Sequence, residues 1–115
     1  MKWEQQKTEF DAMIEELRTL LWDKGLEYAG PEDCLGNLKR ASEIGVTPEQ
    51  KLWIFLDKHL SSIKSYIREG KTFSNETIDG RICDAINYLF LLRCLIRDKE
   101  QAEAEKLRVE HGVYS

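Results

Sequence analysis

The feature that most constrains the fold is a 15-residue run, 82–96, that is apolar on almost every side of a helix. Its leucines and isoleucines recur at helical rather than alternating spacing. A helix that is apolar all round must be covered all round. The other helices of one small domain cover only one or two of its faces. We therefore expect the face near Phe90, Cys94 and Arg97 to contact another subunit, unless the helix is simply central to its own bundle.

Apolar periodicity and end signals predict four helices and no strand. Trp3, Phe10 and Leu17 recur at intervals of seven residues, and Thr47 with Gln50 matches a capping box. Seven glycines and two prolines in 115 residues are few, which favours long helices over a turn-rich β fold. The predicted spans are 2–24, 31–45, 47–70 and 74–97. Gly25 is expected to end the first helix, and Pro31 to lie in the first turn of the second.

Length and charge bound the class of protein. One α-helical domain is expected over 1–97, followed by a polar helical extension over 98–115. The net charge of −4 argues against strong nucleic-acid binding, which needs a basic surplus. The chain has no signal-peptide core, no stretch long enough to span a membrane and no paired cysteine motif. We expect a cytoplasmic protein with no membrane partner.

Polar side chains interrupt the apolar helix on one side. Helical spacing places Arg81, Asp84 and Tyr88 close together, with Asn87 slightly further round. An unpaired buried charge costs several kcal/mol, so these groups are either paired or used in binding. An Arg81–Asp84 pair that only fixes the helix register is the simpler interpretation.

Two further clusters suggest a nucleotide ligand. His59 lies on an inner helix face beside Lys58, and Arg81 could approach both, which would make a seat for a phosphate. A histidine satisfied within the core is the alternative. Lys24, Tyr28 and Asn37 would suit a nucleobase through stacking and edge hydrogen bonds, unless Tyr28 is a core residue. The nearby Lys39 and Arg40 are interpreted as a solvated face.

These residues together resemble a known family. The carriers are Lys24-x-x-Glu27-Tyr28, Leu35-x-Asn37, Asp57-Lys58-His59, Asn75-Glu76 and Gly80-Arg81-Ile82-x-Asp84-x-x-Asn87-Tyr88-Leu89. They resemble small phage proteins of the nucleotide modification associated domain group, which look like distant relatives of the MazG-like nucleotide pyrophosphatases. The resemblance covers roughly residues 20–97. It implies an all-α, MazG-like bundle of four to five helices, completed by oligomerisation, with nucleotide sites near subunit interfaces.

The resemblance also bears on metal binding. MazG-like enzymes hold Mg²⁺ with four acidic residues on two helices. The matching stretches here are Asp57-Lys58-x-x-Ser61 and Asp84-x-x-Asn87, in which only Asp57 and Asp84 are acidic. Two carboxylates beside a lysine would hold Mg²⁺ poorly, which favours nucleotide binding over catalysis.

The sequence thus predicts a phage-type homo-oligomer, in the host cytoplasm, that binds a nucleotide or cyclic nucleotide without turnover and without a cofactor. Such a protein could act as a sponge for a host defence signal. Phosphates would contact Lys58, His59 and Arg81, base or ribose edges would contact Asp84 and Asn87, and Tyr28 or Tyr88 would stack. One alternative is a Mg²⁺-dependent nucleoside triphosphate pyrophosphohydrolase with Asp57 and Asp84 as metal ligands. A second is a structural or interaction module.

Overall fold

The fold is entirely helical in the residues that the computed structural model describes, 1–25 and 32–112. The predicted all-α class is therefore confirmed for this part of the chain. No helix within it is both long enough and apolar enough to cross a membrane. In chain order the elements are α1 (Trp3–Thr19), the π-helical turn η1 (Leu20–Lys24), α3 (Gly36–Lys39), the 3₁₀ turn η2 (Arg40–Ile44), α4 (Pro48–Glu69) and α5 (Ile78–Glu110).

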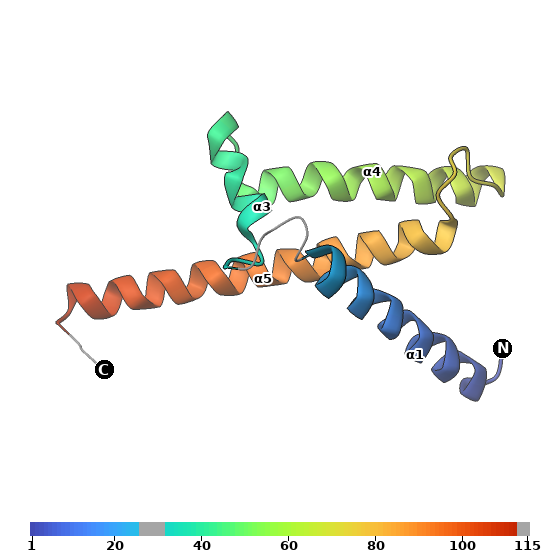
Figure 1. Ribbon diagram of the computed structural model, residues 1–115, viewed down its shortest axis with the longest axis horizontal. Helices are drawn as coiled ribbons and strands as arrows, with labels where there is room; N and C mark the ends of the chain where they lie inside the picture. The colour runs from blue at the N-terminus through green and yellow to red at the C-terminus, as the bar shows by residue number, and fades with distance from the viewer. Residues whose placement is uncertain (26–31, 113–115) are drawn as a thin grey trace.

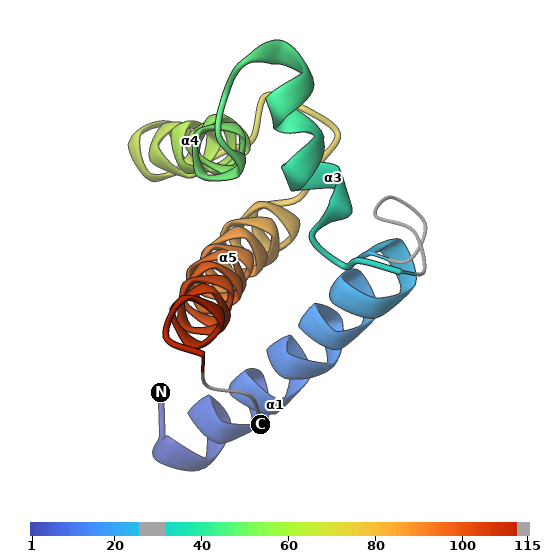
Figure 2. The ribbon, with the colours of Figure 1, turned by 90° about the vertical axis from the view of Figure 1, so that its left-hand side faces the viewer.

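Helix α5 lies at the centre of the arrangement. It runs antiparallel beside α4, while α1 crosses its other side and α3 lies across one end of α4 (Figures 1 and 2). The core forms between α3, α4 and α5. The buried members of this core are Leu35, Leu38, Leu52, Leu56, Ala85 and Leu95. Full burial of one of these leucine side chains stabilises the fold by about 1.5–3 kcal/mol.

The ends of α4 follow the predicted capping chemistry. The Thr47 hydroxyl accepts a hydrogen bond from the Gln50 amide at 3.1 Å, and the Gln50 side chain accepts one from the Thr47 amide at 2.9 Å. Gly70 ends the helix with a left-handed φ of 75°, which glycine adopts without strain. Helix α5 begins at Ile78, later than predicted, because Thr77 rather than Ser74 supplies the N-cap oxygen.

The segment before α4 differs from the predicted helix over 31–45. The helix begins only at Gly36, because the Asp33 carboxylate accepts a hydrogen bond from the Leu35 amide and holds a turn before it. Pro31 and the rest of 26–31 lie outside the described residues. Gly25 has a right-handed helical φ of −60°, so it does not supply the left-handed stop that the sequence suggested.

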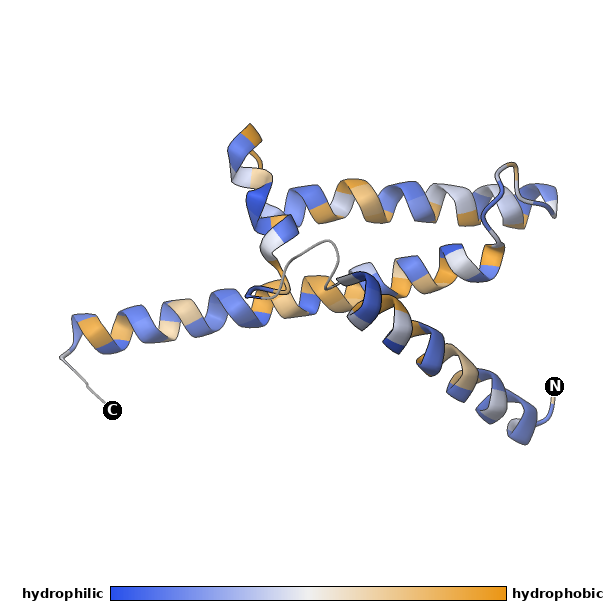
Figure 3. Ribbon diagram, in the orientation of Figure 1, coloured by the Kyte–Doolittle hydropathy of each residue, from blue (hydrophilic) through white to orange (hydrophobic). Residues whose placement is uncertain are grey.

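Much apolar surface stays uncovered in this arrangement. Helix α1 contains no buried residue, and α5 continues unbroken to Glu110 with every residue from 96 onward exposed. The radius of gyration is 17.9 Å, whereas a compact chain of this length has about 13 Å. In Figure 3 the hydrophobic part of α5 ends near its middle, and the remainder is mostly hydrophilic. A single copy is thus elongated and open.

Candidate functional site

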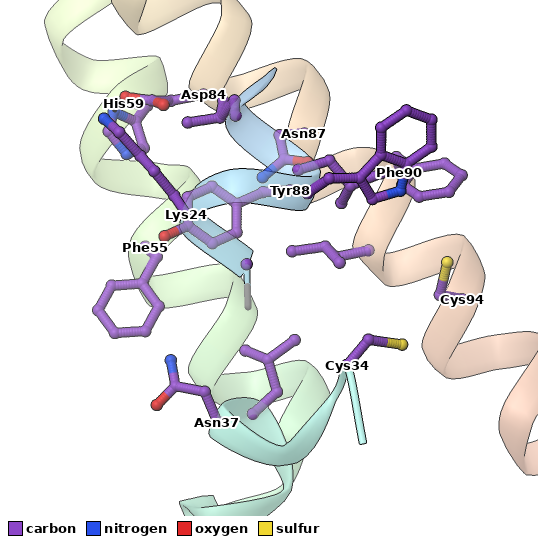
Figure 4. A pocket seen from close by; sticks show the side chains of 16 residues that line it. Lys24, Cys34, Asn37, Phe55, His59, Asp84, Asn87, Tyr88, Phe90 and Cys94 are labelled. Atoms are coloured by element: carbon purple, nitrogen blue, oxygen red, sulfur yellow. Dashed lines mark ion pairs between the residues drawn. The ribbon is translucent and has the colours of Figure 1, made fainter. Parts of the chain in front are cut away.

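A cavity of about 630 Å³ lies where η1 and α3 meet the facing sides of α4 and α5 (Figure 4). Cavities of this size are typical of small-molecule sites. Most of its wall is aliphatic or aromatic, with a few polar groups among them. The lining residues are Leu20, Leu21, Trp22, Lys24, Gly25, Cys34, Asn37, Leu38, Phe55, His59, Asp84, Asn87, Tyr88, Phe90, Leu91 and Cys94.

Six of the nine predicted ligand-binding residues line this cavity, although they come from four different elements. They are Lys24, Asn37, His59, Asp84, Asn87 and Tyr88. Two others, Lys58 and Arg81, are not among the lining residues. Tyr28 lies outside the described part of the chain.

The cluster of three cations predicted as a phosphate seat is not assembled. Lys58 is exposed and does not line the cavity. Arg81 is only 7% exposed, and its guanidinium already has partners within the chain. Its Nε lies 3.0 Å from the Glu76 carboxylate, its Nη1 donates to His59 Nδ1 at 3.2 Å, and its Nη2 reaches Ser74 Oγ at 3.5 Å. Among the described lining residues, Lys24 alone is a lysine or arginine.

The simpler expectation of an Arg81–Asp84 pair is replaced by a different pairing. Glu76, from the connector before α5, takes the place of Asp84 as the carboxylate partner of Arg81. Asp84 lies instead 3.7 Å from His59 Nδ1. This leaves the Asp84 carboxylate facing the cavity rather than neutralised by a guanidinium.

His59 is held in its neutral form. Burial lowers its pKa below the ordinary value of 6.5, and the Arg81 charge lowers it further, against the opposing effect of Asp84. Arg81 can only donate, so His59 Nδ1 accepts, and the ring hydrogen is assigned to Nε2. His59 therefore offers one N–H donor and carries no charge at neutral pH.

This lowered pKa predicts a pH-dependent stability. The unfolded chain takes up the His59 proton more readily than the folded chain, so the free energy of unfolding falls as the pH drops below about 6.5. Urea unfolding at pH 7.5 and pH 5.5 measures the effect, and His59→Asn is expected to reduce the difference. His111→Asn, at the exposed end of α5, is the control and should keep it. Equal pH dependence in wild type and His59→Asn would contradict the assignment.

The aromatic residues of the cavity have two roles. The Tyr88 ring stacks on Phe55 and His59, at centroid distances of 5.9 and 5.6 Å, so it forms part of the wall. Trp22 and Phe90 keep about half of their surface exposed, at 55% and 46%. These two rings, rather than Tyr88, are available to stack on a planar ligand.

The sequence favoured a core position over base stacking for Trp22, and neither Trp22 nor Phe90 was predicted as a site residue. The π-helical turn of Leu20–Lys24 brings Trp22 to the cavity, and no sequence signal marks that turn. Phe90 was assigned to a subunit contact, although its position three residues after Asn87 puts the two on adjoining helix positions. That spacing could have found it.

The three cysteines occupy different environments. Cys34 and Cys94 line the cavity, whereas Cys83 is buried and donates to the Glu16 carboxylate of α1 at 3.3 Å. Burial and this hydrogen bond raise the pKa of Cys83 to about 11. A thiol with that pKa is almost entirely protonated at neutral pH, so Cys83 joins α1 to α5 and is not a nucleophile.

A divalent metal does not fit the candidate ligands. His59, Glu76 and Asp84 place one potential ligand atom each within 4.8 Å of one another. However, the Arg81 guanidinium already bonds to Glu76 and to His59 Nδ1, and its positive charge opposes a second cation. Mg²⁺ also requires several oxygen ligands in octahedral geometry. Asp57, the other carboxylate expected to bind Mg²⁺, is exposed and not part of this group.

Comparison with known proteins gives no further constraint. No family model, no curated protein and no solved structure matches this chain. Its function is therefore inferred from the geometry and chemistry of the cavity.

Proposed function

We propose that this chain binds a nucleotide in the cavity between η1, α3, α4 and α5 and releases it unchanged. The observation that carries the proposal is the composition of the cavity wall. Exposed faces of Trp22 and Phe90 can stack on a base, while Asp84, Asn87 and Asn37 offer hydrogen bonds to its edges. The exposed Lys24 is the group available for a phosphate.

The phosphate part of this proposal differs from the sequence expectation. Arg81 is engaged with Glu76 and His59, and Lys58 lies outside the cavity. With one lysine in the described lining, a ligand with few phosphates is favoured over a triphosphate. The poor fit for Mg²⁺ likewise favours binding over pyrophosphate hydrolysis. Binding without hydrolysis would be sufficient for a phage protein that sequesters a nucleotide-derived signal.

We also propose that the chain works as a homodimer or a higher even oligomer. Ile82, Leu89 and Ile96 recur every seven residues along one face of α5 and are 37%, 52% and 44% exposed. Helix α1 adds an apolar stripe that contains no fully buried residue within one copy. A second copy is a partner with matching apolar surface, because a twofold contact presents the same patch from both sides. We call Ile82, Leu89 and Ile96 the α5 stripe.

A capture experiment tests the binding proposal. The protein is incubated with a panel of linear and cyclic nucleotides, with and without Mg²⁺, freed of unbound ligand and heat-denatured, and the released compounds are identified by mass spectrometry. An intact nucleotide is expected in both conditions. Release of a monophosphate with pyrophosphate would show hydrolysis instead. An empty trace would leave an interaction module as the function.

Two lysines provide a matched pair of variants for the same experiment. Lys24→Ala removes the cation at the cavity, so the dissociation constant is expected to rise about tenfold, the loss of one charged hydrogen bond. Lys58→Ala removes an exposed lysine outside the cavity and should leave it unchanged. Isothermal titration calorimetry with the captured nucleotide measures both. The reverse order of effects would place the phosphate near Lys58 and contradict the site.

A further inference from the structure

The polar end of the cavity has a defined pattern of acceptors and donors. His59 from α4 and Asp84 from α5 approach each other there, with Asn87 one turn further along α5 (Figure 4). Within the described residues, no donor lies within hydrogen-bonding distance of the Asp84 carboxylate. His59 Nδ1 lies 3.7 Å from an Asp84 carboxylate oxygen, and the lone pair of that nitrogen accepts a hydrogen bond from Arg81. Asp84 therefore presents two acceptor oxygens to a ligand.

Donors line the same cavity as these acceptors. The neutral His59 ring carries its hydrogen on Nε2, and the Asn87 side chain offers an amide N–H₂ group. The cavity thus combines two adjacent acceptors with donors from the same wall. A ligand that satisfies it needs two adjacent N–H donors beside one acceptor.

Among the common bases, guanine alone has that edge. Its N1–H and N2–H₂ groups are adjacent donors, and its O6 is an acceptor beside them. A carboxylate can accept both donors at once, in the same two-point geometry that it uses with arginine. Adenine and cytosine would instead direct a ring-nitrogen lone pair at the carboxylate. Uracil and thymine offer a single N–H between two carbonyl oxygens.

We propose that the base bound in this cavity is guanine, with Asp84 accepting from N1–H and N2–H₂ and with Asn87 or His59 donating to O6. The proposal rests on the proposed nucleotide binding and adds its base specificity. Phe90 and Trp22 supply the stacking surface, which does not discriminate between purines. Specificity therefore depends on Asp84.

Calorimetric titration with three purine monophosphates tests this assignment. Guanosine monophosphate is expected to bind about tenfold more tightly than inosine monophosphate, which lacks only the 2-amino group, and about 100-fold more tightly than adenosine monophosphate. If none of the three binds, and the nucleotide panel is also not retained, the proposed function fails. If a nucleotide binds but adenosine monophosphate is preferred or equal, only the guanine assignment fails.

Variants of two aspartates on α5 separate recognition from folding. Asp84→Asn offers one acceptor and one donor in place of two acceptors, so the preference for guanosine over inosine monophosphate should disappear. Asp79→Asn, at an exposed position five residues earlier, should keep the full preference. Thermal unfolding of both variants checks that each is folded. An Asp84→Asn protein that is folded and still prefers guanosine monophosphate tenfold would overturn the proposal.

Discussion

Replacing Leu89 with glutamate is expected to reduce the molar mass in solution to that of one 13.5 kDa chain, from at least twice that value in the wild type. Leu89 is the central residue of the α5 stripe and is half exposed in a single copy. Placing a carboxylate in an apolar contact costs several kcal/mol, and a twofold interface contains the substitution twice. Light scattering coupled to size-exclusion chromatography measures the mass.

The matched control for Leu89→Glu is Ile67→Glu. Ile67 is 78% exposed near the end of α4 and lies outside the α5 stripe, so the same change of charge should leave the oligomer intact. Nucleotide binding by the Leu89→Glu variant is a second measurement, because the next residue, Phe90, lines the cavity. A wild type that is already a single chain at micromolar concentration would contradict the oligomer, as would a Leu89→Glu variant of unchanged mass.

The parts of this structure that the sequence predicts are those set by local chemistry. The capping box at Thr47 and Gln50 forms as expected, because both hydrogen bonds span only three residues. Asp84, Asn87 and Tyr88 reach the same cavity, since positions three and four apart lie on one side of a helix. Periodicity alone therefore predicted that these residues share one wall of the cavity.

The parts that the sequence misses depend on contacts between elements. Lys58 and His59 were assigned to one phosphate seat, but adjacent helical residues point about 100° apart. With His59 facing the core, Lys58 therefore points to solvent. The pairing of Arg81 with Glu76 requires the connector between α4 and α5 to fold back over the start of α5, and no local rule specifies that path. Both features place less positive charge at the cavity than the sequence led us to expect.

Arg81→Met is expected to lower the free energy of unfolding by about 2 kcal/mol at pH 7. The variant loses the contacts of the guanidinium with Glu76, His59 and Ser74, while methionine retains much of the buried aliphatic volume. Loss of a fully buried ion pair costs about 3–5 kcal/mol, but the Glu76 side chain is 54% exposed and regains hydration, so the smaller figure applies. Urea unfolding measures the change. Arg68→Met is the control, because Arg68 is 72% exposed and, among residues 1–25 and 32–112, pairs only with adjacent Glu69, which predicts a change within about 0.5 kcal/mol.

The pKa of His59 gives a second readout of Arg81→Met, which distinguishes a structural cation from a phosphate-binding one. Arg81 lowers the pKa of His59, whereas Asp84 and Glu76 raise it, so removing the guanidinium should raise the pKa measured by NMR titration. Guanosine monophosphate should still bind the folded variant, because Arg81 does not line the cavity. If Arg81→Met instead leaves stability and the His59 pKa unchanged but abolishes binding, the guanidinium contacts the phosphate. The cavity would then hold more positive charge than Lys24 alone provides, and ligands with several phosphates would fit it.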